Sequence, residues 1–191
     1  MHIGITPDDE YIKTEKVPGP TKEEIRTIVL SKLHIQEDDT IVDVGCGTGG
    51  LTVEFAKRCK KVYSIDVNVD AINTTKANLE KFNLSSNVEV LEEDGASALE
   101  HIDGFTRVMI GGSGGNLKDI IRIGYDKLPV GGRLVTTSIV LETATDSVEV
   151  LKELGASVEV VTLNVSRGII LKRGVMMKAL NPITIVSATK V

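Results

Sequence analysis

The residues best suited to chemistry lie in a glycine-rich run from Asp43 to Gly50, Asp-Val-Gly-Cys-Gly-Thr-Gly-Gly. It joins a β-branched segment (40–44), which predicts a buried strand, to a segment (51–59) with apolar residues at helical spacing. Such a turn needs residues without a Cβ, because its backbone takes positive φ and its N–H groups approach a ligand closely. Asp66 follows a second apolar strand, about 20 residues after the first glycine, where a carboxylate can accept hydrogen bonds from both ribose hydroxyls. The run therefore predicts a site for a nucleotide-like cofactor.

Two classes of cofactor use glycine turns of this spacing. Gly45, Gly47 and Gly50 match the G-x-G-x-x-G of dinucleotide-binding proteins. Asp43 with the glycines at 45, 47 and 49 matches the acid-x-G-x-G-x-G of S-adenosylmethionine (SAM) methyltransferases. We favour SAM, because a carboxylate inside the first strand suits its cationic methionine end and would repel a pyrophosphate. A turn that binds nothing is the remaining alternative, and Asp66 argues against it. The cofactor-binding residues predicted in this turn are Asp43, Gly45, Cys46, Gly47, Thr48 and Gly49.

The order of the predicted elements indicates the fold class. Strands are expected at 40–44, 61–65, 87–91, 105–110, 133–138, 157–171 and 182–189, and helices at 51–59, 69–82, 116–128 and 143–154. Alternating strands and helices imply an α/β fold with a doubly wound, mostly parallel sheet. The last two β-rich runs have no helix between them, so we expect a seven-stranded Rossmann-like methyltransferase sheet that ends in an antiparallel strand pair.

Length and composition limit the possible functions. A chain of 191 residues fits a single domain (1–191), with an N-terminal lid and helix region (1–34) and a terminal β-rich region (156–191). No apolar run approaches the roughly 20 residues of a membrane span, and the polar, proline-punctuated start is unlike a signal peptide, so we expect a cytoplasmic protein without a membrane partner. The net charge of −5 and the absence of Trp argue against a nucleic-acid partner. Cys46 and Cys59 lack metal-site spacing, so we expect no metal and two reduced thiols.

The loop after the third strand contains a further acid. Asp94 can accept a hydrogen bond from the adenine amino group, while Gly95 and Ala96 leave room for the ring. Asp94 could equally cap a helix that begins before Ser97. Both interpretations stay open at this point.

The loop after the fourth strand is the most unusual part of the chain. It contains four glycines and one serine, and the predicted substrate-binding residues are Gly111, Gly112, Ser113, Gly114 and Gly115. Exposed N–H groups at the start of a helix can cradle a carboxylate or phosphate, whereas close packing of two backbones would also require glycine. An Asn/Asp-Pro-Pro-aromatic motif, common where nitrogen is methylated, is missing here. We therefore expect an acidic acceptor.

Three segments together carry a family resemblance. Residues 7–13 and 17–26, the glycine turn, and residues 110–115 resemble the precorrin methyltransferases of cobalamin biosynthesis, in particular the decarboxylating cobalt-precorrin family that acts at carbon 15. The resemblance covers nearly the whole chain. It implies SAM-dependent C-methylation of a corrin precursor with loss of carbon dioxide from the ring-C acetate side chain. The macrocycle itself can accept the electrons of decarboxylation, so neither a metal nor pyridoxal is required.

The resemblance also implies roles for particular segments. Thr21 should reach the cofactor from the N-terminal segment, and it could also form a capping box with Glu24. A homo-oligomer, specifically a tetramer, is expected. The strands at Val158–Val165 and Ile183–Val186 could pair or pack between its subunits.

No residue is assigned as catalytic. His101 lies at the end of a short helical pattern and is expected at the surface, which favours catalysis by positioning. Lys13, Lys16, Arg167 and Arg173 are candidate cations for the substrate carboxylates.

Two other functions stay open. A SAM-dependent methyltransferase acting on RNA or protein would share the cofactor half of the chain. A non-catalytic nucleotide-binding module would bind the cofactor without transferring a methyl group.

Overall fold

The computed structural model describes residues 4–191, so the first three residues of the predicted N-terminal region lie outside the described residues. The helices are α1 (Glu23–Leu33), α2 (Gly50–Ala56), α3 (Val69–Lys81), the short 3₁₀ helix η1 (Ser85–Asn87), α4 (Gly95–His101), α5 (Leu117–Lys127) and α6 (Leu141–Glu153). The strands are β1 (Thr40–Val44), β2 (Lys61–Asp66), β3 (Val88–Glu92), β4 (Arg107–Ile110), β5 (Arg133–Ser138), β6 (Ser157–Leu163), β7 (Ser166–Leu171), β8 (Gly174–Ala179) and β9 (Ile183–Thr189). Within residues 4–191, no helix has the length and apolar character needed to cross a membrane.

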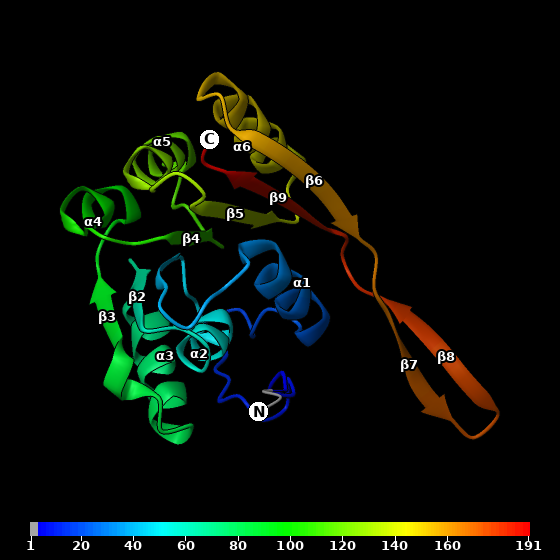
Figure 1. Ribbon diagram of the computed structural model, residues 1–191. Helices are drawn as coiled ribbons and strands as arrows, with labels where there is room; N and C mark the ends of the chain where they lie inside the picture. Colours follow the sequence, from blue (N-terminus) through cyan, green and yellow to red (C-terminus); the bar gives the residue numbers. More distant parts are fainter. Residues whose placement is uncertain (1–3) are drawn as a thin grey trace.

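One large sheet organises the molecule, with the strand order β3-β2-β1-β4-β5-β9-β6 (Figure 1). The pairs from β3 to β5 are parallel, whereas β9 runs antiparallel to both β5 and β6. The predicted α/β fold, its seven-stranded sheet and its antiparallel end are confirmed. Because the strand order reverses between β1 and β4, a ligand crevice is expected at the carboxyl ends of these two strands.

Helices cover both faces of the sheet (Figure 1). Alternate residues of β1 point to opposite faces, so Ile41 and Val42 are both fully buried but belong to different cores. Ile41 packs in the core that contains Phe55 of α2, together with α1 and α3. Val42 packs in the core that contains Ile120 of α5, together with α4 and α6. Strands buried on both faces explain the nearly continuous apolar runs in the sequence.

The N-terminal segment (4–22) is held against α2 and α3 by specific hydrogen bonds. The Thr6 N–H donates to the carboxylate of Glu54 at 2.8 Å. The side-chain amide of Asn78 accepts from the Ile12 N–H at 2.7 Å and donates to its carbonyl at 3.2 Å. The second half of the segment lines the cavity at the carboxyl end of β1 with Val17, Pro18, Gly19 and Thr21, and its role as a lid stays a prediction.

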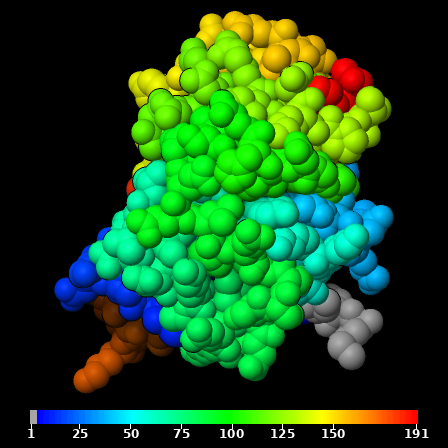
Figure 2. Space-filling model, turned by 90° about the vertical axis from the view of Figure 1, so that its left-hand side faces the viewer, coloured from blue at the N-terminus to red at the C-terminus, as the bar shows by residue number. Residues whose placement is uncertain are grey.

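The predicted strand at 157–171 is in fact two shorter strands. The β-rich run 157–171 is divided at 164–165 into β6, in the large sheet, and β7, which pairs only with β8. This β7–β8 hairpin, called the arm below, projects from the body of the molecule (Figure 1) and extends past the outline of the body in the space-filling view (Figure 2). Strand β8 was not predicted. The apolar side chains of the arm are largely exposed. Its strands therefore lack the alternation of buried and exposed residues by which a strand is predicted from sequence.

The expectation for the terminal strands is partly wrong. Ile183–Val186 lies in β9, which is paired on both edges by β5 and β6 and is therefore not available to another subunit. Strand β6, which contains most of Val158–Val165, is an edge strand of the sheet. Only this second segment has a free edge.

Candidate active site

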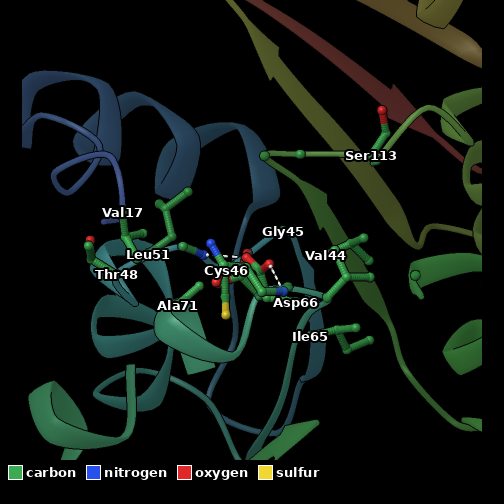
Figure 3. A pocket seen from close by; sticks show the side chains of 18 of the residues that line it. Val17, Val44, Gly45, Cys46, Thr48, Leu51, Ile65, Asp66, Ala71 and Ser113 are labelled. Atoms are coloured by element: carbon green, nitrogen blue, oxygen red, sulfur yellow. Dashed lines mark hydrogen bonds between the residues drawn. The ribbon is translucent and has the colours of Figure 1, made fainter. Parts of the chain in front are cut away.

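A cavity of about 350 Å³ lies at the carboxyl ends of β1, β2 and β4, where the fold predicts a ligand crevice. We call it the donor cavity. Figure 3 shows Val17 and Thr48 on one side of it and Ser113 on the other. Most predicted site residues line it, namely Thr21, Asp43, Gly45, Cys46, Gly47, Thr48, Asp66, Asp94, Gly95, Gly111, Gly112, Ser113 and Gly114. Gly49, Ala96 and Gly115 do not line it.

Gly45 is required by close packing between the two glycine loops. Its φ is +74°, and a Cβ at this position would lie 2.4 Å from the backbone nitrogen of Gly112. The Gly45 N–H donates to the carbonyl of Ile65 at 2.8 Å, and the Gly111 N–H donates to that of Val44 at 2.9 Å. These N–H groups are therefore used inside the protein. The Gly112 N–H also points to the Val44 carbonyl, at 3.4 Å, so close backbone packing accounts for Gly111 and Gly112 without an anion.

Asp66 is fixed at the edge of the donor cavity by backbone hydrogen bonds. One carboxylate oxygen accepts from the Gly47 N–H at 3.0 Å, a bond drawn in Figure 3, and the other accepts from the Asn68 N–H at 2.9 Å. Each oxygen has a second lone pair for a ligand hydroxyl. The turn itself is anchored by Thr75, whose hydroxyl donates to the Gly47 carbonyl at 3.0 Å. Asp66 is thus held in a position where its carboxylate can accept hydrogen bonds from a ligand.

Asp43 lies at the bottom of the donor cavity and is almost completely buried, with 1% of its surface exposed. Burial raises its pKa to about 7, although the Thr52 hydroxyl, which donates to it at 2.6 Å, opposes the increase. The charge of Asp66 adds to the increase in pKa. Near neutral pH, Asp43 can therefore change its charge when a cationic group binds beside it.

A second cavity of about 710 Å³ adjoins the first, and we call it the acceptor cavity. Both cavities are lined by Pro18, Gly19, Thr21, Gly111, Gly112, Ser113 and Thr137. The acceptor cavity is mainly apolar, with Ile25, Leu117 and Leu180 among its lining residues. A group bound in one cavity would therefore meet a group bound in the other across a shared wall.

The two cavities have opposite charge. Among residues 4–191, the donor cavity is lined by four carboxylic acids, Asp43, Asp66, Glu93 and Asp94, and by no Lys, Arg or His. Lys22 is the single ionisable residue of the described chain that lines the acceptor cavity. The first cavity therefore suits a cationic ligand and the second an anionic one.

Comparison with known proteins agrees with this arrangement. The sequence model of the precorrin methyltransferase domain matches residues 18–190. The chain belongs to the precorrin methyltransferase family. It is 50% identical, over 96% of its length and 98% of the relative's, to the probable cobalt-precorrin-6B C(15)-methyltransferase (decarboxylating) of Methanobrevibacter smithii.

Solved structures extend the comparison. The precorrin 8W decarboxylase of Methanobacterium thermoautotrophicum is 45% identical, with a TM-score of 0.93 over 96% of this chain and 98% of that one. The precorrin-6y C5,15-methyltransferase of Geobacter metallireducens is 32% identical, with a TM-score of 0.90 over 97% of each chain. A tRNA (m1A58) methyltransferase of Aquifex aeolicus, 14% identical with a TM-score of 0.75 over 95% of this chain and 73% of that one, shares the fold alone. The resemblance predicted from sequence is confirmed.

In this family member, Asp94 caps a helix. It is the N-cap of α4, and one of its oxygens accepts from the N–H groups of Ala96 and Ser97 at 3.0 and 3.2 Å. The other oxygen accepts from the side-chain amide of Asn116 at 3.2 Å. The capping interpretation is thus observed. Contact with adenine stays a prediction, which the position of Asp94 in the donor cavity allows.

Thr21 lines both cavities, but the predicted capping box with Glu24 is wrong. Lys22 is the N-cap of α1 and makes no side-chain capping bond, because the chain enters the helix one residue later than the pattern indicated. The carboxylate of Glu24 instead accepts two hydrogen bonds from Arg167, at 2.9 and 2.6 Å. The Thr21 carbonyl accepts a hydrogen bond from the buried side chain of Arg26.

The structure brings none of the predicted substrate cations to either cavity. Lys13, Lys16, Arg167 and Arg173 are absent from both linings. Lys16 pairs with Asp70 at 3.2 Å, and Arg167 is paired with acids. The cation that lines the acceptor cavity is instead Lys22, which was not predicted although it lies next to Thr21 within the motif that carries the family resemblance.

Neither His101 nor Cys46 is suited to a catalytic role. His101 is exposed at the end of α4, its ring 3.0 Å from the carboxylate of Glu93, and it lines neither cavity. Burial raises the pKa of the Cys46 thiol to about 12, so this residue of the donor cavity is a poor nucleophile. Within residues 4–191, no cluster of His, Cys, Asp and Glu has the arrangement of a metal site.

Proposed function

We propose that this protein methylates a cobalt-precorrin intermediate at carbon 15 with SAM and removes the carboxylate of the ring-C acetate as carbon dioxide. The observation that carries the proposal is the pair of adjoining cavities. Acids line the first, and the mainly apolar second cavity has a single cation in its lining. A cationic methyl donor and a polycarboxylate acceptor would fit these charges. The names of the similar proteins support the same reaction.

The residues of the donor cavity fit SAM. Asp66 would accept hydrogen bonds from the ribose, and Asp43 would face the cationic methionine end. Gly95 lines the donor cavity beside Asp94, where adenine would lie, and it packs against β1 so closely that a Cβ there would lie 2.5 Å from a methyl carbon of Val44. When bound, SAM supplies an electrophilic methyl group. Thr21, on both cavity linings, would close over the methionine end.

The acceptor cavity would act by positioning the macrocycle. In decarboxylation, the bond between the acetate methylene and its carboxylate breaks and carbon dioxide leaves. The electron pair moves into the conjugated macrocycle, and a proton from solvent completes the new methyl group. Apolar residues such as Ile139, Val140 and Ile183 would surround the leaving carboxylate without stabilising it. In residues 4–191 only Lys22 could carry a proton in this cavity, so a reaction driven by orientation is favoured.

Mass spectrometry of cobalt-precorrin-6B incubated with the protein, with and without SAM, tests the proposal. Gain of one methyl group with loss of one carbon dioxide is expected when SAM is present. Methyl gain alone would contradict the decarboxylase part. An unchanged corrinoid, despite SAM binding measured by calorimetry, would contradict the assignment and favour an RNA or protein substrate.

The arm supports a homo-oligomer, and we propose the tetramer suggested by the family resemblance. Its exposed apolar residues are Ile169, Ile170, Leu171, Val175, Met176 and Met177. An isolated two-stranded hairpin is only marginally stable in water, so this arm is expected to pack against another copy of the chain. The two buried, unpaired cysteines are compatible with the reducing cytoplasm, where we propose that the protein acts.

A further inference from the structure

Lys22 occupies a position that the proposed reaction leaves without a role. It is the residue that precedes the first turn of α1, it is half-buried, and it lines the acceptor cavity. Within residues 4–191, its amino group has neither a hydrogen-bond partner nor an ion-pair partner. A cation in a ligand-sized cavity is therefore available to a ligand.

Most lysines near the site are either paired or remote. Lys16 pairs with Asp70 at 3.2 Å, and Lys57 lies 3.7 Å from the carboxylate of Glu54. Lys13 is unpaired within the described chain but exposed, and it lines neither cavity. Lys22 is thus distinguished by the combination of a free amino group and a place in the cavity wall.

The surroundings of Lys22 strengthen its attraction for an anion. The rest of the acceptor cavity is uncharged and mainly apolar, and a pair of opposite charges attracts more strongly there than in water. The first turn of α1 contains two acids, Glu23 and Glu24, and neither pairs with Lys22 among the described residues. Glu24 is held by two hydrogen bonds from Arg167. An incoming carboxylate would therefore meet an uncompensated ammonium group.

The chemistry limits which carboxylate Lys22 can hold. An ion pair stabilises a carboxylate in the ground state, so pairing Lys22 with the leaving carboxylate would oppose its loss as carbon dioxide. Pairing with a carboxylate that stays on the macrocycle instead fixes the orientation of the ring. The leaving group then faces the uncharged wall formed by Ile139, Val140 and Ile183.

We propose that Lys22 is the positioning residue of the acceptor cavity, and that its ammonium group binds a side-chain carboxylate that the corrinoid retains in the product. The inference rests on the proposed function, because it takes the occupant of this cavity to be a polycarboxylate corrinoid. It adds that Lys22 sets the orientation of the corrinoid ring in the acceptor cavity. It also separates the anchored carboxylate from the one that leaves.

The test measures binding as well as turnover. Cobyrinic acid, a corrin with free side-chain carboxylates, and its methyl ester are used as probes in equilibrium dialysis. Lys22→Gln removes the charge, Lys22→Arg retains it, and Lys13→Gln removes a charge from the same segment outside both cavities. We expect Lys22→Gln to bind cobyrinic acid about tenfold more weakly, with ester binding unchanged, and Lys22→Arg and Lys13→Gln to resemble the wild type. SAM affinity should be equal in all four proteins, which shows that they are folded.

Kinetics with cobalt-precorrin-6B provide the second readout. Lys22→Gln should raise KM by about tenfold and leave kcat nearly unchanged, because the anchored carboxylate is bound equally in the ground and transition states. Equal binding of cobyrinic acid by Lys22→Gln and wild type would overturn the role of Lys22 while leaving the proposed function intact. An increase in kcat in Lys22→Gln would show that Lys22 holds the leaving carboxylate, which contradicts the inference. Failure of the wild type to bind either probe or to convert the precorrin would reject the proposed function itself.

Discussion

The guanidinium of Arg167 donates to both carboxylate oxygens of Glu24, at 2.9 and 2.6 Å, and so ties the start of the arm to the first turn of α1. The same guanidinium lies 2.8 Å from Asp8 of the N-terminal segment. Asp8 also pairs with Arg26, which donates to the carbonyl of Thr21. A continuous set of ion pairs, completed by one hydrogen bond to the Thr21 carbonyl, therefore connects the base of the arm to a residue that lines both cavities.

Arg26 is the central member of this set, and its removal should destabilise the protein. Its side chain is completely buried, and it donates to Asp8 at 2.8 Å and to the carbonyls of Thr6 and Thr21. We expect Arg26→Met to lower the free energy of unfolding by about 3 kcal/mol, because it leaves a buried carboxylate and two carbonyls short of a donor. Urea denaturation at pH 7.5 measures the change.

Arg122→Met is the matched control for that substitution. Arg122 pairs with Glu153 at 2.9 Å, but both side chains are about half exposed. Removing an exposed ion pair should hardly change the urea midpoint. Equal losses in the two variants would contradict the structural role given to Arg26.

The glycine turn offers a second comparison, between Gly45 and Gly47. Both have positive φ, +74° and +58°, but only a Cβ at position 45 would overlap the backbone of Gly112. We expect Gly47→Ala to cost about 1–2 kcal/mol of stability from its backbone conformation alone. Gly45→Ala should cost clearly more and should weaken SAM binding by at least about tenfold, since the two glycine loops must separate. Calorimetry and urea denaturation of both variants check this, and similar behaviour of the two would argue against the close approach.

Asp43 should make stability depend on pH in a defined range. Its pKa in the folded protein, about 7, is above its ordinary value of 3.8, so between these values the folded state retains a proton that the unfolded state has released. The stabilising contribution of protonated Asp43 is therefore complete below pH 4 and is lost as the pH rises to about 7. Asp43→Asn resembles the protonated acid and should lack this dependence. As the pH rises from about 4 to about 7, the unfolding free energy of the wild type should fall relative to that of Asp43→Asn by up to about 1.4 kcal/mol per pH unit.

The same residue should affect SAM binding in the opposite direction. A cationic ligand favours ionised Asp43, so the SAM affinity of the wild type should increase as the pH rises from 6 to 8. Asp43→Asn should bind SAM more weakly and without this increase. A wild-type affinity that stays constant over this range would contradict a role for the charge of Asp43.

The sequence predicted the sheet and the donor cavity well because both depend on local signals. The glycines at 45 and 47 mark a turn that few other residues can form, and the apolar runs around Ile41 and Ile65 mark strands buried on both faces. The predicted acids Asp43 and Asp66 do lie together in one cavity. Such features can be identified without knowing what packs against them.

The acceptor cavity could not be predicted in the same way, because its wall is assembled from distant segments. Lys22, Thr137 and Asn181 come together only when α1, the end of β5 and the residues before β9 are packed. Arg167 was expected at the substrate because its charge could be read from the sequence, while its acidic partners 143 and 159 positions earlier could not. Strand β8 and the separation of β7 from the large sheet were missed, because the apolar residues of the arm are not buried within the chain.

The arm gives a prediction about assembly. Ile170 is 80% exposed and Met177 is 61% exposed, and both belong to the hairpin that lies outside the main sheet. We expect Ile170→Lys combined with Met177→Lys to shift the protein from an oligomer to a monomer in light scattering at micromolar concentration, because charges would be placed in a buried interface. Val130→Lys, at a residue 81% exposed in the turn before β5, should leave the mass unchanged. A wild-type protein that is already monomeric would exclude the proposed assembly.

Asp66 connects the fold of the turn to recognition of the cofactor, and two substitutions can separate these roles. Its carboxylate accepts hydrogen bonds from the N–H groups of Gly47 and Asn68, so Asp66→Ala removes both the support of the turn and the acceptors for a ribose. Asp66→Asn keeps one acceptor oxygen and most of the support. We expect SAM binding by calorimetry to weaken about tenfold in Asp66→Asn and about a hundredfold in Asp66→Ala, with a lower melting temperature only in the latter. Asp70→Ala, which removes an exposed partner of Lys16, should change neither quantity. If Asp66→Asn bound SAM as tightly as the wild type, the ribose would have to be held by other residues, and the charge of Asp66 would serve the turn alone.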